Sequence, residues 1–461
     1  MKLWRVLTIL VFSLTIFIPV AAFNFDEDAI SEIDNRMLAE NPFQGEIWGD
    51  GDLTKAVENY INDRIGFRDE MILIYTVLND RIFGKMTHPG YSYGKEGYVF
   101  GVGLSRETYG EFHETFAEMV SQIQEYCEER SVPFLFVFNP AKTSVLTEYL
   151  PDGINYDHSW VDKFLADLDR RGIHYIDNTV LMKEKTENGE LVYNIKYDAN
   201  HWNDLGAFYG TNNILTALAE KLSGIYINME EDIIIEECLK TSLPVSRFPI
   251  HEMVPQISLD MDYENISSEY EDELILDSRY SGFGYYVNRD QREKKAPRAL
   301  VFQGSYMNSY GGKFMINSFG EYIHIHDYQN VINFPYYFNI FKPDCVIFEV
   351  AEYTLNNGYF DVERMKAMDL NPVLDEKVLK NSDILKEDLN SENLLIEEGQ
   401  TLTDILWKTD EKKEYAWLRL GDDVYDFMKT ESGFETTVRT KDYATYKGKA
   451  LEIILLQIMD S

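Results

Sequence analysis

The chain has 461 residues, enough for two or three domains, and its 45% hydrophobic and 14% aromatic residues exclude a disordered protein. Its 43 basic and 79 acidic residues give a net charge of −36, which argues against nucleic acid as the main partner, because binding one requires a basic face. The three cysteines, Cys127, Cys238 and Cys345, match neither a disulfide framework nor a metal-ligand spacing, so we expect buried thiols.

The N-terminal sequence is typical of an exported protein. Lys2 and Arg5 precede an apolar run over residues 6–22, and the run ends in small residues that suit cleavage. Its length is near the lower limit for a membrane-spanning helix, so residues 1–23 are either a signal peptide or a retained signal anchor. We expect residues from about 24 onward to be extracytoplasmic, either secreted or held at the membrane by this segment alone.

Residues 24–88 read as a helical lead-in. Apolar residues keep helical spacing on both sides of a break at Gly66 and Phe67, and Arg64 and Arg68 flank the break. A hairpin with glycines at its turn positions is expected over 93–100.

Residues 89–370 alternate between helical and strand patterns. A helix at 107–130 precedes a strand at 132–138, a helix at 160–168 precedes a strand at 173–176, a strand at 191–195 precedes a helix at 205–222, and further strands are expected at 298–303 and 345–350. Fully apolar strands between helices predict an α/β domain with a mostly parallel sheet flanked by helices. Residues near 224–296 are acidic and tyrosine-rich without a period, and we interpret them as an insertion that lines a cleft.

The character of the sequence changes after residue 370. We interpret 371–410 as a linker and 411–461 as a small β-rich accessory module, because short runs there alternate with Gly and Asp turns. Trp417, Tyr425 and Tyr443 suit two hypotheses, stacking on sugar rings or packing in the core of the module, and the second is the commoner use of such residues.

Asp198 and His201 lie three residues apart among aromatic residues, at the predicted start of a helix. This spacing allows the carboxylate to fix the tautomer of the imidazole, as in nucleophilic catalysis. The alternative is a turn rich in Asn and Asp that caps the helix. Ser305 directly follows the predicted strand 298–303 and its Gly304, a position that exposes a nucleophile, so the three residues supply the parts of a triad.

This set of residues resembles the SGNH (GDSL-like) hydrolase superfamily, with the Asp/His block placed before the serine. That order, the residues 60–68, the hairpin 94–100 and the run 201–203 are similar to the permuted AlgX/AlgJ-like and DHHW-type proteins of bacteria, over roughly residues 24–360. These relatives are associated with O-acetylation of exported polysaccharides.

The resemblance implies an SGNH-like fold in which Ser305 is the nucleophile, His201 the general base and Asp198 the carboxylate that orients it. The implied function is O-acyl (acetyl) transfer to an extracellular or cell-envelope polysaccharide, or removal of the acyl group by an esterase. The implied acyl donor is supplied by a membrane acyltransferase. No cofactor is expected.

Four further residues are site candidates. Asn139 and Asn308 are candidate oxyanion donors, although Asn139 also suits a cap at a strand end. Lys142 and Tyr310 are candidate substrate contacts, and a solvated surface lysine is an equal alternative for Lys142.

His324 and His326 alternate on a strand-like run that ends in Asp327, a pattern that also occurs in metal sites. Because no third group of ligands is evident, we interpret them as structural or surface histidines and expect no metal.

A rival hypothesis is a non-catalytic glycan-binding or scaffold component of an envelope assembly. Gln303 and Gly304 stand where the related proteins often have Gly and then Asp or Thr before the serine, and their Asp/His block is often one residue shorter. A reactive triad predicts ester turnover that needs all three residues, whereas a scaffold predicts binding that tolerates their loss.

Overall fold

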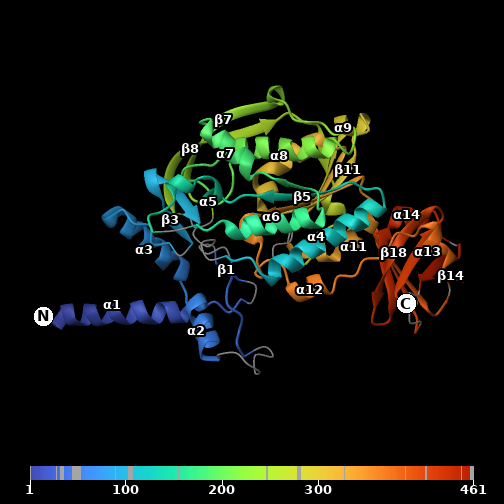
Figure 1. Cartoon of the computed structure of the whole chain (residues 1–461). Helices are drawn as coiled ribbons and strands as arrows, with labels where there is room; N and C mark the ends of the chain where they lie inside the picture. Colours follow the sequence, from blue (N-terminus) through green and yellow to red (C-terminus); the bar gives the residue numbers. More distant parts are fainter. Residues whose placement is uncertain are drawn as a thin grey trace.

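A computed structural model of the chain describes residues 2–26, 29–31, 36–43, 53–88, 90–101, 107–153, 156–244, 248–277, 282–326, 328–389, 391–410, 413–447 and 449–456. Figure 1 shows a central α/β domain with an N-terminal helix projecting on one side and a β module on the other.

The central domain is built on a mixed sheet that is mostly parallel. Its strands, in spatial order, are β6 (Tyr175–Asp177), β5 (Phe134–Asn139), β13 (Cys345–Ala351), β11 (Arg298–Gln303), β12 (Glu321–His326), β10 (Gly282–Asn288) and β9 (Tyr263–Asn265). The first five run parallel, and β10 and β9 add antiparallel pairs at one edge. The predicted α/β class and mostly parallel sheet are therefore confirmed.

Helices cover both faces of this sheet, which accounts for the continuous apolar strands. Phe134 and Phe136 point into one core with α4, α6 and α11, whereas Leu135 and Val137 point into the other with α7, α8 and α10. The helices of the domain are α4 (Glu111–Glu129), α5 (Lys142–Val145), α6 (Ser159–Arg171), α7 (Thr179–Glu187), α8 (Asp204–Ala219), α9 (Arg289–Glu293), α10 (Gly312–Ser318), α11 (Phe334–Phe341) and α12 (Val362–Lys366).

The strand predicted at 191–195 is wrong, since the structure has no strand there. Its backbone groups are satisfied individually instead of by a ladder: Ile195 O accepts from Val99 N at 2.9 Å, and Ile195 N donates to the Glu252 carboxylate at 2.6 Å. The apolar pattern that suggested a strand reflects the burial of Val192 and Tyr193, which pack in the core without pairing in a ladder.

The insertion predicted near 224–296 is also only partly correct. Strands β7 (Ile233–Ser242) and β8 (Pro249–Leu259) form an antiparallel hairpin, but β9 and β10 belong to the central sheet. Most residues of β7 and β8 are exposed or half-buried, so the hairpin has no sustained apolar alternation from which it could be predicted. It packs on α8, where Ile257 N donates to the Asp204 carboxylate at 2.6 Å.

The N-terminal part consists of helices and a small hairpin. Its elements are α1 (Lys2–Ala21), β1 (Ile30–Ser31), β2 (Arg36–Met37), α2 (Leu53–Arg64), α3 (Arg68–Phe83), β3 (Tyr91–Tyr93), the short helix η1 (Lys95–Gly97) and β4 (Val99–Gly101). Among the described helices, α1 has the length and composition to cross a membrane, which fits a signal sequence or an anchor. The expected hairpin and the helix break at Gly66 are both present.

The C-terminal module is an open antiparallel sheet. Its strands, in spatial order, are β14 (Ser382–Glu387), β20 (Leu451–Leu456), β17 (Tyr415–Leu420), β18 (Asp423–Thr430), β19 (Gly433–Arg439), β16 (Leu402–Lys408) and β15 (Leu394–Glu398); its helices are α13 (Glu376–Lys380) and α14 (Thr440–Ala444). Strands β14, β15 and β16 fall within 371–410, so the predicted linker requires correction. Charged, exposed residues concealed β14 and β15 in the sequence, whereas β16 is mostly buried. Trp417, Tyr425 and Tyr443 are all buried, as the second hypothesis for them predicts, and Tyr425 and Tyr443 belong to the core cluster of the module.

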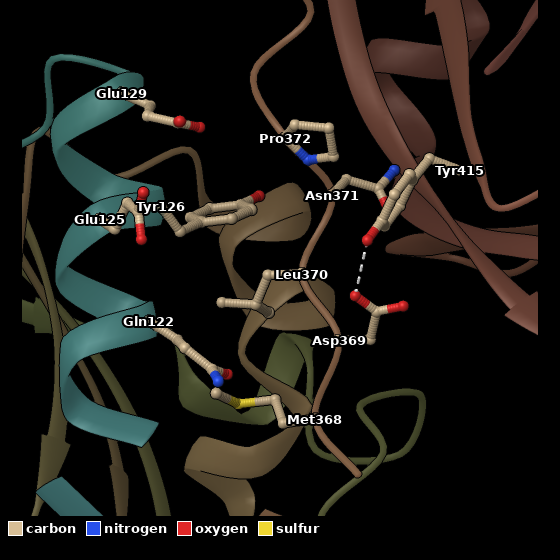
Figure 2. A pocket seen from close by; sticks show the side chains of 10 residues that line it. All are labelled: Gln122, Glu125, Tyr126, Glu129, Met368, Asp369, Leu370, Asn371, Pro372 and Tyr415. Carbon is tan, nitrogen blue, oxygen red and sulfur yellow. Dashed lines mark hydrogen bonds between the residues drawn. The ribbon is translucent and has the colours of Figure 1, made fainter. Parts of the chain in front are cut away.

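Where the module meets α4, the chain forms an open pocket of about 320 Å³. Figure 2 shows it between α4, the connection at 368–372 and Tyr415 of β17, whose hydroxyl donates to Asp369 at 3.0 Å. None of the predicted site residues lines it. Of the cysteines, Cys127 and Cys345 are buried thiols as expected, whereas Cys238 is half-buried on β7.

Candidate active site

The carboxyl ends of β5, β13 and β11, three adjacent strands, bring the predicted residues together. Ser305 follows β11, Tyr353 lies in the short helix η8 (Glu352–Thr354) after β13, and Asn139 ends β5. Asp198 and His201 reach the same edge from the loop before α8. In an open α/β sheet this edge is where ligands usually bind, since loops there can present groups above the strand ends.

A chain of hydrogen bonds joins Asp198, His201 and Ser305. His201 Nδ1 lies 2.8 Å from each carboxylate oxygen of Asp198, and its Nε2 lies 2.8 Å from Ser305 Oγ. The carboxylate fixes the tautomer in which Nδ1 carries a proton, which leaves Nε2 free to accept one from the serine hydroxyl. The side chains of His201 and Asp198 are only 17% and 10% exposed, so water screens this arrangement weakly.

The backbone conformation at Asp198 lets its carboxylate accept hydrogen bonds from its own turn as well as from His201. Asp198 has a φ of 64°, a left-handed conformation that Asp tolerates, and its Oδ1 accepts from the N–H groups of Asn200 at 3.1 Å and His201 at 3.0 Å. Burial acts to raise the pKa of Asp198, but the His201 imidazole and these hydrogen bonds outweigh it and lower the pKa to about 2. The carboxylate is therefore ionised at any ordinary pH.

Three tyrosines surround the imidazole. Tyr310 OH donates to Asp198 Oδ2 at 2.9 Å, and Tyr306 OH lies 2.7 Å from both Pro140 O and Asn200 O. Tyr353 OH contacts Ser305 Oγ and lies 2.7 Å from His201 Nε2. Only Tyr310 was predicted as a site residue. In a chain with 31 tyrosines, the sequence has no signal that distinguishes Tyr306 and Tyr353 from the others.

The buried carboxyl group of Glu349 supports the turn that presents Ser305. Gly304 N donates to Glu349 Oε2 at 2.5 Å, and Asn139 Nδ2 donates to Glu349 Oε1 at 2.8 Å. A Cβ at Gly304 would stand 3.2 Å from Glu349 Oε2, so glycine suits this close approach. Burial raises the pKa of Glu349 to about 7, against the lowering effect of these donors.

The oxyanion candidates differ in their surroundings. Asn139 is fully buried, and its amide is engaged by Glu349 and by Asn178, whose Nδ2 donates to Asn139 Oδ1 at 2.8 Å, so it supports the strand end, which is the alternative role expected for it. Asn308 is exposed, one turn after Ser305, with Oδ1 accepting from Gln303 at 3.3 Å. Ser305 N lies in the first helical turn after β11, where N–H groups have no carbonyl partner within the helix.

Lys142 does not fit either role that the sequence suggested for it, since its side chain is completely buried. Its Nζ donates to Val99 O at 2.9 Å, Ile195 O at 3.0 Å and Asp198 O at 3.4 Å. Burial lowers the pKa of Lys142 to about 7, although the Asp198 carboxylate acts in the opposite direction. Lys142 therefore joins the hairpin strand β4 to the loop that carries Asp198.

Glu252 supports the same loop from the β7–β8 hairpin. Its carboxylate accepts from Ile195 N at 2.6 Å, Lys196 N at 2.9 Å and Tyr197 N at 2.6 Å. Glu252 was not predicted as a site residue, because it lies in the segment that has no readable period. The loop at 195–201 is thus held by two charged side chains, the buried Lys142 and the half-buried Glu252.

The two histidines of β12 have structural surroundings. His324 is buried beside Tyr286, with ring centroids 5.9 Å apart, and His326 Nδ1 lies 2.9 Å from Gln303 O. Asp327 lies outside the described residues. Within the described ranges, no group of three or more His, Cys, Asp or Glu side chains is placed to hold a metal ion.

Comparison with known families identifies one match. Residues 94–232 match the model of the SGNH hydrolase-like domain of the acetyltransferase AlgX. The resemblance found in the sequence is confirmed for this segment, which contains Asp198 and His201 and ends before Ser305. A comparison with curated proteins gives no match.

Several solved structures are similar to this chain at low identity. PatB1 of Bacillus cereus is 18% identical, with a TM-score of 0.44, over 58% of this chain and 95% of that one. A DHHW family protein from Eubacterium siraeum is 16% identical, with a TM-score of 0.41, over 61% and 96%. The O-acetyltransferase domain of Pseudomonas putida AlgJ is 15% identical, with a TM-score of 0.43, over 61% and 99%.

Proposed function

We propose that this protein, whose residues 94–232 are similar to the SGNH hydrolase-like domain of an acetyltransferase, is an extracytoplasmic O-acyltransferase or esterase. It acts on an extracellular or cell-envelope polysaccharide and transfers an acetyl or related acyl group through Ser305, His201 and Asp198. The observation that carries the proposal is the 2.8 Å contact between His201 Nε2 and Ser305 Oγ, together with the carboxylate at Nδ1.

The proposed first step is acylation of the serine. Ser305 Oγ attacks the acyl carbonyl carbon while His201 Nε2 accepts the hydroxyl proton, and Asp198 stabilises the imidazolium that forms. The oxyanion is stabilised by Ser305 N–H and by the Asn308 side chain, which is the more accessible of the two predicted amides. When the intermediate collapses, the bond to the leaving group breaks and His201 returns the proton to that group.

The second step reverses the first with a new nucleophile. A sugar hydroxyl, or water, gives its proton to His201 and attacks the acyl carbonyl carbon; the bond from that carbon to Ser305 Oγ then breaks, and His201 returns the proton to Oγ. In the transferase the acyl donor comes from a membrane acyltransferase. Tyr353 OH contacts both Ser305 Oγ and His201 Nε2, so it is placed to orient the hydroxyl before attack.

Ester hydrolysis by the full-length protein in detergent tests the proposal, with a chromogenic acetyl ester as substrate. We expect turnover in the parent and its loss in Ser305→Ala and His201→Ala, with unchanged unfolding curves. Ser309→Ala is the matched control, because Ser309 is exposed in the same helical segment and is not part of the proposed triad.

A second readout separates a strict transferase from an inactive scaffold. A serine-reactive phosphonate should label Ser305 in the parent and not in Ser305→Ala, even if water is a poor acceptor. A parent protein that neither hydrolyses the ester nor reacts with the probe would support the scaffold hypothesis and overturn the enzyme.

A further inference from the structure

Helix α3 presents an apolar face to the outside of the molecule. The residues on this face are Met71, Ile74, Tyr75, Leu78 and Ile82, which are 45%, 59%, 60%, 51% and 65% exposed. Their spacing of three and four residues places them on one stripe along the helix, about 17 Å long at 1.5 Å per residue. A helix on the surface of a soluble domain normally turns polar residues to water, so this stripe requires a covering layer.

The opposite face of α3 is fixed to the domain. Val77 packs against a small core that includes Val99 and Ala199, and Asp80 accepts from Tyr93 OH at 2.9 Å. Thr76 of the same helix is also buried. Because the inner face is already occupied, the helix cannot rotate to bury the stripe within the described part of the chain.

The stripe begins where α1 ends. Gly66 N donates to Pro19 O at 3.0 Å, Asn24 N donates to Arg64 O at 2.8 Å, and Ala22 packs directly against Gly66. The turn before α3 therefore contacts the last residues of the helix that has the length and composition to cross a membrane. Both helices lie on the same side of the central domain, away from the C-terminal module (Figure 1).

We propose that the stripe on α3 is a second membrane contact, which lies in the lipid bilayer at its outer surface beside α1. Side chains of this type, with Tyr75 among the aliphatic residues, suit the boundary between headgroups and acyl chains. The net charge of −36 repels anionic lipid, so the contact is hydrophobic in origin. The prediction that only residues 1–23 meet the membrane is thereby extended to α3.

The contact has a consequence for the site. The small core beneath α3 contains Val99 and Ala199, which belong to the strand and loop that Lys142 joins. Docking of α3 therefore holds the loop of Asp198 and His201 close to the membrane. This inference rests on exposed surface and on the end of α1, and it stands whether or not the proposed acyl transfer is correct.

Fluorescence quenching in the full-length protein tests the proposal. The protein is reconstituted into vesicles of phosphatidylcholine and phosphatidylglycerol, with an environment-sensitive dye at Leu78→Cys or Ile82→Cys in a Cys238→Ser background. We expect nitroxide lipids to quench both dyes and aqueous iodide to leave them unquenched. Val180→Cys is the control, since Val180 is 70% exposed on α7 and should show the opposite pattern.

Two results would overturn the proposal. Iodide quenching at position 78 equal to that at position 180 would mean that the stripe faces water. Protection from both quenchers would mean that protein covers it, either a second copy or a membrane-protein partner. As a further variant, Leu78→Asp with Ile82→Asp should abolish lipid quenching of a dye at Ile74→Cys, while ester turnover in detergent stays at the parent level.

Discussion

Asp198 performs two tasks at once, since its carboxylate orients His201 and also accepts the backbone N–H groups that shape its own turn. Asp198→Asn keeps the size of the side chain but no longer requires Nδ1 to carry the proton. We expect kcat for ester hydrolysis to fall by about 10³- to 10⁴-fold, because the wrong tautomer presents a proton to Ser305. An Asn variant with parent-level turnover would exclude Asp198 from the mechanism.

The same carboxylate links stability to pH. The pKa of Asp198 is about 2 in the folded chain, below its ordinary value of 3.8, because His201 and the hydrogen bonds outweigh the effect of burial. Its contribution to stability is therefore complete above about pH 4 and is lost as the pH falls towards 2. Acid unfolding curves of the parent and of Asp198→Asn should accordingly converge in that range.

We also expect the hydroxyl of Tyr353 to contribute to ester hydrolysis. Tyr353→Phe removes a phenol that contacts both Ser305 Oγ and His201 Nε2 and leaves the contact between those two atoms intact. A neutral hydrogen bond is worth about 1 kcal/mol, so kcat/KM should fall by about fivefold. Tyr175→Phe, at the far edge of the sheet, is the control and should have no effect on kcat/KM. An increase in kcat/KM would indicate that Tyr353 competes with the serine for Nε2.

The residues that the sequence could identify differ from the others in chemical type. Asp198, His201 and Ser305 could be identified because an acid, an imidazole and a hydroxyl stand at the predicted start of a helix or directly after a predicted strand. The structure brings them within hydrogen-bonding distance. Tyr353 and Glu252 act only through the partners that the fold brings to them, so no local pattern distinguishes them. The buried position of Lys142 was equally unpredictable, since lysine is almost always exposed.

At the scale of elements, the loop at 195–201 is built from contacts that replace a strand ladder. Lys142 satisfies three buried carbonyls of this loop and of β4. Lys142→Met should lower the free energy of unfolding by about 1–3 kcal/mol, because it removes the lysine donor to Val99 O and Asp198 O, while Ile195 O keeps the bond from Val99 N. Chemical denaturation measures this, and Lys95→Met on the exposed tip of the same hairpin should change it by less than about 0.5 kcal/mol.

The difference in unfolding free energy between the parent and Lys142→Met should increase with pH. Burial lowers the pKa of Lys142 from 10.5 to about 7, so the unfolded chain binds a proton that the folded chain releases between these values. The parent gains stability relative to Lys142→Met as the pH rises through this window. A difference in unfolding free energy that is constant from pH 6 to pH 10 would mean that the lysine stays charged in the fold.

The sequence predicted elements well where both faces of a strand are buried and poorly where strands are exposed. Strand β11 was found at its observed limits, Arg298–Gln303, because a short apolar run bounded by turn residues is typical of a strand buried on both faces. Strands β7, β14 and β15 carry charged residues on open faces, so their pairing depends on partners far along the chain. The strand predicted at 191–195 was wrong for the opposite reason, because this run is apolar but pairs with no neighbouring strand.

At the scale of the whole molecule, the central domain and the C-terminal module share a buried polar junction. Asp426 of β18 is 4% exposed, accepts from Tyr126 OH of α4 at 2.6 Å and pairs with Arg130 at 3.2 Å. Its backbone exchanges hydrogen bonds with Asn339 of α11 at 2.8 and 3.1 Å. These contacts couple the module to the helices that cover one face of the sheet.

Asp426→Ala should uncouple the two parts, because it removes the acceptor of the Tyr126 hydroxyl and the ion pair with the half-buried Arg130, hydrogen bonds to a charged group that are worth about 1.5–3 kcal/mol each. In calorimetry we expect the variant to show the module and the central domain unfolding in separate transitions. Asp426→Asn should restore most of the coupling, since its amide oxygen still accepts from Tyr126. Burial raises the pKa of Asp426, so as the pH falls the folded chain takes up this proton before the unfolded chain does. Separate transitions in the parent protein would instead mean that the junction is too weak to couple the two parts.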